Sequence, residues 1–444
     1  MCAACLKHWA ANRNNSLVGI YQKRGTRTMR VAINGAGIAG TALAYWLSRM
    51  GHEVLLLERA PELRTGGYIL NLWGVGYDAV EKMGLLPRLL ELQYETDELR
   101  MVDRQGRTRG GYSSQVLQNL ANGRIATLAR ADIAAAIYGL LDSRVETIFG
   151  ASVATIEDDG GRAHVGIEQG QQREVDLVVG ADGLHSKIRQ ITFGPDGQFE
   201  HPLGCHAASF EVAGYRPRND NLYVAHTAPG RYIARFPIRD DKTLIFMLLR
   251  DEYLPIITPS NDYERKAALT NAFSNMGWEC PAILSALENA DSIYFDSISQ
   301  VRMDEWTKGR VTLVGDAAAC PSLIAGEGAG FALAEAYVLA GEIHNRQGDL
   351  GSALKRYQER IKPYAKRKQR YAEGLVPSFV PKTELGVRAR DLATLLMRLP
   401  VFPKLLMGRY FHDAMELPQY AMSCSATQTP PNKSSKPTPL RGAA

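Results

Sequence analysis

The stretch Gly35-Ala36-Gly37-Ile38-Ala39-Gly40 lies between a short apolar run, 30–34, and a longer apolar segment, 38–50. A G-x-G-x-x-G pattern between a strand and a helix is typical of a pyrophosphate-binding turn. Its glycines permit a tight turn, a close approach of the phosphates and close packing of helix on strand. We therefore predict a strand at 30–34, a helix at 38–50 and a second strand at 53–57. Such a βαβ unit implies a parallel sheet with helices on its faces.

A carboxylate, Glu58, closes the second strand, 18 residues after Gly40. At this place a carboxylate accepts hydrogen bonds from a ribose diol and disfavours a 2′-phosphate. The N–H groups at the start of the helix point at the phosphates. The expected ligand is therefore FAD or NAD rather than NADP, and a glycine-rich turn without a ligand is the alternative interpretation.

Two further glycine turns follow apolar runs, Gly180-Ala181-Asp182-Gly183 after 176–179 and Gly315-Asp316-Ala317-Ala318 after 311–314. Asp316 is placed to accept a hydrogen bond from a sugar or ribityl hydroxyl. The loop 326–330 then leads into a helix whose first N–H groups, at Ala329 and Gly330, would meet an electron-rich acceptor. For Asp182, a plain strand–helix turn with a helix cap is an equal alternative. Because the carboxyl ends of parallel strands share one edge, we expect the three turns to converge there.

Together and in this order, the three motifs resemble the fingerprints of the single-component (class A) flavoprotein monooxygenases, the group typified by para-hydroxybenzoate hydroxylase. Further stretches resemble the tetracycline-inactivating monooxygenases and their relatives, namely 66–72, 82–85, 295–301, 306–310, 336–342 and 417–420. The resemblance implies an α/β fold. It consists of a Rossmann-like FAD-binding domain of the glutathione-reductase type, an inserted, mainly antiparallel β-sheet substrate domain, and C-terminal helices.

This resemblance divides the chain into five parts. We expect a flexible or presequence-like extension at 1–29, a discontinuous FAD-binding domain at 30–200 and 301–345, a substrate-binding domain at 201–300, C-terminal helices at 346–420 and a disordered tail at 421–444. A start at Met29, one residue before the first strand, is an alternative interpretation of the extension.

The resemblance implies FAD as the cofactor and NADPH or NADH as the co-substrate. The expected FAD-binding residues are Gly35, Gly37, Ile38, Ala39, Gly40, Glu58, Arg59, Asn71, Arg130, Asp182, Gly183, Gly315, Asp316, Ala329 and Gly330. The glycine loop with Glu58 and Arg59 would bind the ADP half, and Arg130 would lie beside the ribityl–phosphate region. Asp182 and Gly183 would contact both FAD and the nicotinamide cofactor. Asp316 would contact the FAD linker, and Ala329 and Gly330 would contact the isoalloxazine.

Two positions depart from the family pattern. Asn71 stands where several relatives have Asp near the flavin, and Gly328-Ala329-Gly330 replaces a more polar Gly-x-Asn sequence. Both departures leave the identity of the substrate open.

The function implied is an FAD-dependent, NAD(P)H-consuming monooxygenase. A flavin hydroperoxide would deliver one oxygen atom of O₂ to an aromatic or polycyclic substrate, as a hydroxylation or a Baeyer–Villiger reaction. No catalytic side chain and no metal site is predicted, since no motif for either occurs. The aromatic candidates for the substrate surface are Tyr223, Tyr232, Phe236 and Phe246. An FAD-dependent oxidase or dehydrogenase, and a non-catalytic flavin-binding protein, are the alternatives.

The composition and the distribution of charge exclude some classes of binding partner. The net charge is +5, but the segments 1–29 and 421–444 carry eight basic and no acidic residues, so 30–420 has a net charge of −3. This distribution argues against nucleic acid. No apolar run reaches the roughly 18 residues of a membrane span. The six cysteines form no disulfide framework. We therefore expect a soluble cytoplasmic monomer or homodimer that acts on a small organic molecule.

Overall fold

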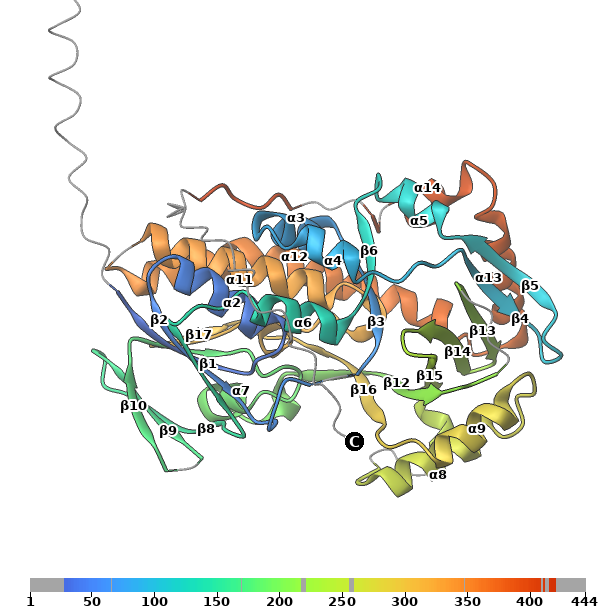
Figure 1. Cartoon of the computed structure of the whole chain (residues 1–444), viewed down its shortest axis with the longest axis horizontal. Coiled ribbons are helices and arrows are strands. Elements are labelled where there is room, and N and C mark those ends of the chain that lie inside the picture. Colours follow the sequence, from blue (N-terminus) through green and yellow to red (C-terminus); the bar gives the residue numbers. More distant parts are fainter. Residues whose placement is uncertain are drawn as a thin grey trace, which may run out of the picture.

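The computed structural model describes residues 28–64, 66–168, 170–216, 221–254, 259–346, 348–408, 410–411 and 415–420. A six-stranded sheet in the order β17-β18-β11-β1-β2-β7 lies on the left of Figure 1. Its strands are β1 (Arg30–Asn34), β2 (Glu53–Glu58), β7 (Val145–Phe149), β11 (Leu177–Gly180), β17 (Thr307–Lys308) and β18 (Val311–Leu313). All neighbours are parallel except β17 and β18. The predicted βαβ unit and parallel sheet are thus confirmed.

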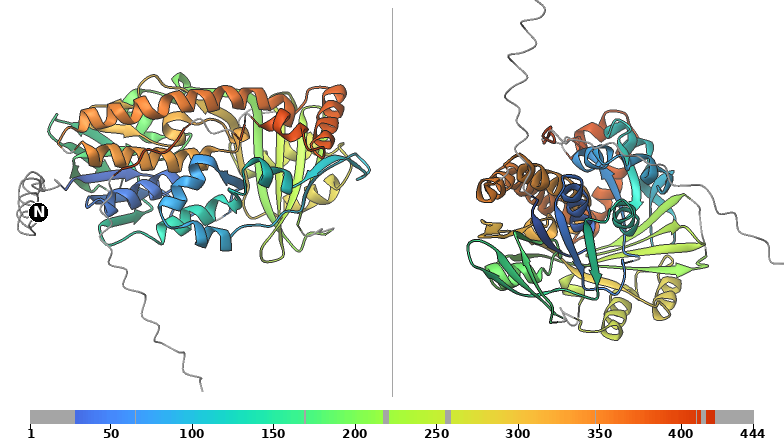
Figure 2. Two further views of the ribbon diagram at one scale, coloured as in Figure 1. Left: turned by 90° about the horizontal axis from the view of Figure 1, so that it is seen from above. Right: turned by 60° about the vertical axis from the view of Figure 1, so that its left-hand side comes forward.

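This sheet carries the main core of the molecule. Val31, Ala32 and Ile33 of β1 are at most 1% exposed, as a strand covered on both faces requires. Helix α2 packs against α11 and α6, and this helical layer is visible in Figures 1 and 2. The helices are α2 (Ile38–Arg49), α6 (Arg130–Tyr138), α7 (Lys187–Phe193), α10 (Asp316–Ala319) and α11 (Gly328–Asn345).

A separate three-stranded sheet, β10-β9-β8, lies below it in Figure 1. Its strands are β8 (Val153–Asp158), β9 (Ala163–Ile167) and β10 (Gln172–Val175). The sequence predicts its third strand at 175–179, and this is wrong because the chain changes sheets at Asp176. The Asp176 carboxylate accepts a hydrogen bond from the backbone N–H of Arg30 at 2.9 Å, and the residues after it form β11.

The second large sheet has seven strands in the order β16-β12-β15-β14-β13-β4-β5. Its strands are β4 (Glu98–Val102), β5 (Thr108–Ser113), β12 (Glu200–Ala213), β13 (Leu222–Ala228), β14 (Arg231–Ile238), β15 (Lys242–Arg250) and β16 (Tyr294–Val301). All pairs are antiparallel except β13 with β4. Strands β4 and β5 join this sheet although they lie within 30–200, which we expected to belong to the FAD-binding domain. The domain boundaries remain predictions.

The two faces of this sheet bury different residues. Ile233 and Met247 pack with α8 (Asp262–Phe273) and α9 (Cys280–Glu288) on one face. Ala234 and Leu248 pack with residues of α12 on the other, which we call the inner face. The alternation follows from the two-residue period of a strand.

A short antiparallel pair and several helices connect the two large sheets. They are β3 (Ile69–Trp73), β6 (Ile125–Ala129), α3 (Gly74–Lys82), α4 (Leu86–Glu91) and α5 (Gln115–Leu120), with the 3-10 turns η1 (Asp196–Gln198), η2 (Asp251–Tyr253) and η3 (Leu323–Ala325).

Three C-terminal helices complete the fold, namely α12 (Leu350–Phe379), α13 (Glu384–Leu396) and α14 (Phe402–Met407). Helix α12 packs along α11 and reaches from the parallel sheet to the seven-stranded sheet (Figure 2, left). It lies within the predicted region of C-terminal helices, 346–420, and its apolar stripe continues to Val376 at the inner face. Within the described residues, no helix has the length and apolar character that crossing a bilayer requires.

Candidate active site

The three glycine turns meet at one edge of the parallel sheet. Strands β18, β11, β1 and β2 are direct neighbours, and Asn34 is in register with both Gly180 and Leu57. The chain segments that follow these strands therefore leave the sheet side by side. The predicted convergence of the turns is confirmed, and it gathers residues that lie almost 300 positions apart in the sequence.

The three glycines of the first loop differ in their surroundings. A Cβ at Gly35, where φ is +110°, would lie 2.5 Å from the carbonyl oxygen of Ala181, and one at Gly40 would lie 1.9 Å from that of Gly35. A Cβ at Gly37 would meet only an arginine atom, Nη2 of Arg130, at 3.9 Å. Gly35 and Gly40 are thus required by packing, whereas Gly37 borders open space at the start of α2. Ile38 and Ala39, in the first turn of this helix, are buried.

Glu58 ties the first loop to the end of β2. Its carboxylate is almost buried and accepts hydrogen bonds from the backbone N–H groups of Ala36, at 2.9 Å, and Ala60, at 3.0 Å. Arg64 forms a longer ion pair with it at 3.7 Å, and Arg59 is exposed beside it. The predicted contact of Glu58 with a ribose remains a prediction.

Arg130 is a half-buried cation at this edge. It begins α6, and within the described residues no hydrogen bond or ion pair joins its guanidinium to another side chain. Burial works against its charge, but the nearby ionisable groups, Tyr68 and Asp316 among them, raise the pKa of Arg130. A half-buried guanidinium beside Gly37, facing a helix start with no acidic residue in its first turn, suits a diphosphate.

Asp316 lies on the other side of this arginine, at the first position of α10. Burial raises the pKa of its carboxyl group, and Arg130 together with a hydrogen bond from Cys320 opposes the rise. Gly315 before it has φ +68°, and its N–H donates to the fully buried Glu335 of α11 at 2.5 Å. Burial raises the pKa of Glu335 well above its usual value. Glu335 was not predicted as a site residue, although an acidic residue inside an apolar helix is a signal of such a contact.

Asp182 has its acceptor capacity used within the protein. Its carboxylate accepts hydrogen bonds from the Asn34 amide at 2.9 Å, the Ser186 hydroxyl at 2.5 Å, and the backbone N–H groups of Lys187 and Ile188 at 2.8 and 3.2 Å. It therefore links β1 to the start of α7, whose N-cap is Ser186. Gly183, with φ +83°, faces open space. The expected contacts of both residues with FAD and the nicotinamide cofactor remain predictions.

Gly330 forms a close helix crossing. Its Cα lies 2.3 Å from where a Cβ of Gly76 would stand, so α11 and α3 touch backbone to backbone. Ala329 beside it is half-buried. Asn71 of β3 accepts a hydrogen bond from the Thr127 hydroxyl at 2.8 Å and lines, with Gly330, a hollow of about 10 Å³. Contacts of these three residues with an isoalloxazine remain predictions.

A buried ion pair between Glu327 and Lys368 borders the same hollow. Both side chains are 8% exposed, and the Lys368 ammonium lies 4.8 Å from the ring centre of Trp73 and 5.0 Å from that of Tyr364. This pair was not predicted from the sequence. Its signal is a lysine within the apolar stripe of α12, between Tyr364 and Ala372.

The aromatic candidates share the inner face of the seven-stranded sheet, since Tyr232, Phe236 and their neighbours in register alternate with residues that face α8 and α9. The Tyr232 hydroxyl donates to that of Tyr223 at 3.0 Å, and the rings of Tyr223 and Phe236 lie 6.0 Å apart. Phe246, the fourth candidate, packs against the same cluster.

Two tyrosines connect this face to the sheet edge. Tyr294 of β16 lies opposite Ser209 and packs against Tyr68, with ring centres 6.0 Å apart. Burial raises the pKa of both phenols, and the charge of Arg130 opposes the rise in each. Tyr68 and Tyr294 therefore join the inner face to the edge with Arg130 and Asp316, and we treat this junction as the candidate active site.

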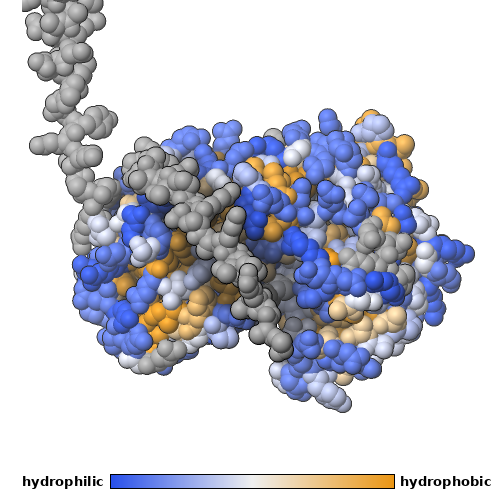
Figure 3. Space-filling view, in the orientation of Figure 1, coloured by the Kyte–Doolittle hydropathy of each residue, from blue (hydrophilic) through white to orange (hydrophobic). Residues whose placement is uncertain are grey.

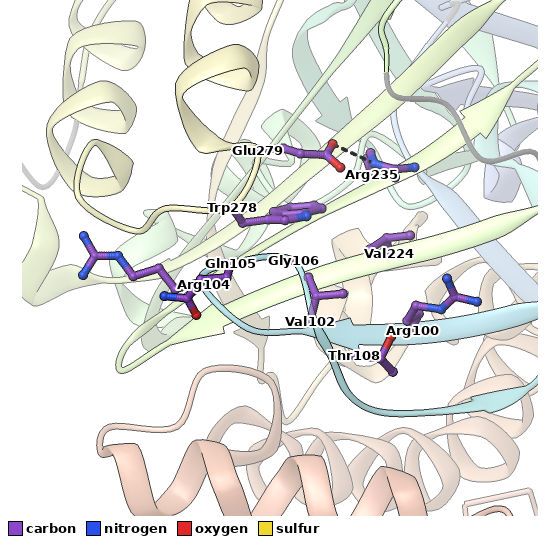
Figure 4. A pocket seen from close by; sticks show the side chains of 10 residues that line it. All are labelled: Arg100, Val102, Arg104, Gln105, Gly106, Thr108, Val224, Arg235, Trp278 and Glu279. Atoms are coloured by element: carbon purple, nitrogen blue, oxygen red, sulfur yellow. Dashed lines mark hydrogen bonds and ion pairs between the residues drawn. The ribbon is translucent and has the colours of Figure 1, made fainter.

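A pocket of about 430 Å³ lies on the opposite face of the same sheet (Figure 4). Arg100, Val224 and Arg235 line it from three adjacent strands in register, and Arg235 pairs with Glu279 at 2.8 Å. Trp278, whose φ is +51°, closes one side. Since this pocket lies across the sheet from the inner face, it is separate from the candidate active site.

Comparisons with known proteins agree with this geometry. A family model described as FAD binding domain matches residues 28–372. The chain is 36% identical over 358 residues to an uncharacterized protein of Mycobacterium tuberculosis, MT1298, covering 79% of this chain and 94% of that protein. It is 30% identical over 390 residues to the flavin-dependent monooxygenase eupH of a Phoma species, covering 81% and 90%.

Solved structures show the same fold. The crystal structure of tetracycline destructase Tet(51) has a TM-score of 0.75 and 28% identity, covering 88% of this chain and 100% of that chain. The structure of Klebsiella pneumoniae HpxO with FAD and uric acid has a TM-score of 0.71 at 19% identity, covering 86% and 96%, and supports the fold alone.

Fold, sheet edge and comparisons together define a class A flavoprotein monooxygenase that depends on FAD. The chain belongs to the family described as FAD binding domain.

Proposed function

We propose that this enzyme takes electrons from NADPH or NADH and inserts one atom of O₂ into an aromatic or polycyclic organic substrate. The main support is the inner face, where Tyr223, Tyr232, Phe236 and Phe246 lie together on the side of the sheet that meets the parallel-sheet edge. A planar apolar molecule is the ligand that such a surface favours, since aromatic rings pack against one another with large buried areas. The likeness to a tetracycline destructase supports the polycyclic class.

The chain's own residues would bind and orient the cofactor. Arg130 would neutralise phosphate charge beside Gly37, and Asp316 would accept a hydrogen bond from a hydroxyl of the cofactor chain. When bound, FAD supplies the electron transfer and the activation of O₂. No side-chain nucleophile is needed for this reaction, so the role of the protein is placement.

The inner face would also keep water from the reacting atoms. Ile324, Val376 and Val380 are at most 6% exposed and pack over the aromatic residues from η3 and from α12 and its C-terminal end. Exclusion of water limits the wasteful release of peroxide, since reactive intermediates decompose or escape in an open site.

The test is a substrate screen on the purified holoenzyme. NADPH and NADH oxidation would be followed with aromatic and polycyclic compounds, with ¹⁸O₂ as the oxygen source and peroxide measured in parallel. We expect a compound that stimulates oxidation and leaves with one ¹⁸O atom. Stoichiometric peroxide with no labelled product would instead show an oxidase, and a flavoprotein that oxidises neither nicotinamide would contradict the proposal.

A further inference from the structure

The C-terminal helices expose an unusual concentration of apolar side chains. Of the eleven exposed large hydrophobic residues in the described part of the chain, seven lie between residues 385 and 406. They are Leu385 (77% exposed), Leu392 (56%), Leu395 (42%), Leu399 (50%), Val401 (74%), Leu405 (75%) and Leu406 (45%). Single exposed leucines are normal on a protein surface, but a group of this size marks an interaction surface.

Helix α13 presents its leucines in a fixed direction. Its buried side, with Val387, Asp391 and Thr394, packs on β5, where the Thr394 hydroxyl accepts a hydrogen bond from the Gly111 N–H at 3.1 Å. Leu399 lies three residues beyond the end of α13, and within the helix Leu385, Leu392 and Leu395 follow one another at intervals of seven and three residues. This spacing places them on one stripe of the helix, away from the sheet.

Basic residues surround this stripe. The segment 382–408 contains five lysines and arginines and two acids, a net charge of +3, whereas the whole of 30–420 has a net charge of −3. Arg390 and Arg398 form ion pairs with Asp391 and Glu98, so the basic character of the surface rests on Lys382, Arg388 and Lys404, which are exposed, against one exposed acid, Glu384. Figure 3 shows apolar surface at the upper right, where Figure 1 draws α14, with hydrophilic side chains around it. We call the seven apolar residues and these three cations the apolar–basic surface.

We propose that the apolar–basic surface docks on a membrane that carries anionic lipids. The leucines would enter the boundary between headgroups and acyl chains, and the cations would meet lipid phosphates. A second copy of this chain is a less suitable partner for this surface. A two-fold axis through the surface would bring its cations, Arg388 and Lys404 among them, close to the cations of the other copy. The charge therefore selects an anionic bilayer over a symmetric dimer.

Docking of this surface would bring the bilayer close to the seven-stranded sheet. Helix α13 contacts β5 and β13, at the edge of the seven-stranded sheet. A bilayer bound there lies beside the sheet that carries the proposed substrate surface, so that apolar compounds dissolved in the membrane would reach it directly. This consequence rests on the proposed function, whereas the docking does not.

The test is flotation of the purified full-length protein with large unilamellar vesicles. One set contains phosphatidylcholine alone, and the other contains equal parts of phosphatidylcholine and phosphatidylglycerol. We expect binding to the anionic vesicles that weakens at high salt. Because burial of a leucine is worth about a factor of ten in an equilibrium constant, Leu392→Ser/Leu405→Ser should lower the partition coefficient by about tenfold or more.

The matched control is Leu90→Ser/Leu140→Ser, which removes two exposed leucines outside this surface, 36% and 39% exposed. It should bind vesicles like the wild type. Flavin content should be unchanged in both double variants, and thermal unfolding shows that each variant is folded at the temperature of the assay. Equal binding by wild type and Leu392→Ser/Leu405→Ser, or no binding by the wild type, would overturn the proposal. A dimer in analytical ultracentrifugation that this variant dissociates, without vesicle binding, would assign the surface to a second copy.

Discussion

Lys368 and Glu327 form a buried ion pair beside the loop that begins α11. Their burial makes the pair costly to break, since removal of one partner leaves the other charge in a poorly solvated site. Such a pair specifies how α12 lies against that loop more than it adds to overall stability.

We predict that Lys368→Met destabilises the protein by about 3–5 kcal/mol, because Glu327 keeps its charge or must take up a proton. The double variant Lys368→Met/Glu327→Gln should recover most of this loss, since neither charge is then buried. Urea unfolding of the wild type, both single variants and the double variant measures the coupling. Equal stability of Lys368→Met and the double variant would show that the two side chains have no coupling free energy.

His52 predicts a dependence of stability on pH. It is 2% exposed, and its Nδ1 accepts a hydrogen bond from the backbone N–H of Met29 at 3.2 Å. Burial, with a contribution from His344, lowers its pKa from 6.5 to about 4. The folded state therefore favours the neutral ring, so this contribution is complete above pH 6.5 and is lost as the pH falls toward 4.

The loss amounts to about 3 kcal/mol over this window. In His52→Gln, the free energy of unfolding should fall less between pH 6.5 and 4, whereas exposed His201→Gln should follow the wild type. Chemical denaturation at several pH values measures these slopes. Parallel curves for wild type and His52→Gln would be inconsistent with a buried neutral imidazole.

At the scale of elements, the contact between α3 and α11 is the closest helix crossing near the site. A Cβ at Gly76 would lie 2.3 Å from the Gly330 Cα, which is backbone and cannot yield. Gly76→Ala should therefore destabilise the protein by about 1–3 kcal/mol. Gly374, inside α12, has nothing within 4 Å of its Cβ position. Gly374→Ala should stabilise by about 0.5–1 kcal/mol. Thermal unfolding measures the stability of the two variants, and equal effects of the two substitutions would refute this account of the crossing.

Helices and strands are predicted best where the apolar periodicity and the turn-forming glycines indicate the same boundaries. The strand–glycine loop–helix–strand unit at 30–58 matches β1, α2 and β2 closely, because its apolar runs are uninterrupted and its glycines have one interpretation. Strands β3 to β6 were not predicted from the sequence. Strands β3 and β6 pair with each other across more than 50 residues, and the hairpin of β4 and β5 joins the sheet through the distant β13. The change of sheet at Asp176 was also not predicted, because it involves a hydrogen bond to Arg30, 146 residues earlier in the chain.

Individual site residues show the same limit. The sequence places Gly35, Gly37 and Gly40 in one motif, but only packing separates the two glycines that the fold requires from the one that borders open space. Glu335 and Lys368 carry no motif at all, and their roles depend on helices that pack from the C-terminal third of the chain.

At the scale of the molecule, the candidate site is assembled from distant segments. Arg130 comes from α6, Asp316 from α10 and Tyr294 from the seven-stranded sheet, and only the three-dimensional fold brings them together. The central claim is that FAD occupies the space beside Gly37 where these segments meet.

The most direct test is a fluorescence titration of flavin-free protein with FAD, comparing the wild type with Gly37→Leu. Gly37 has φ −73°, which any residue adopts, and open space at its Cβ position, so the variant should fold normally. We predict one FAD bound per wild-type chain and at least about a hundredfold weaker binding to Gly37→Leu, because its side chain fills the space for the phosphates. Wild-type affinity in a folded Gly37→Leu variant would contradict the placement of FAD at this loop.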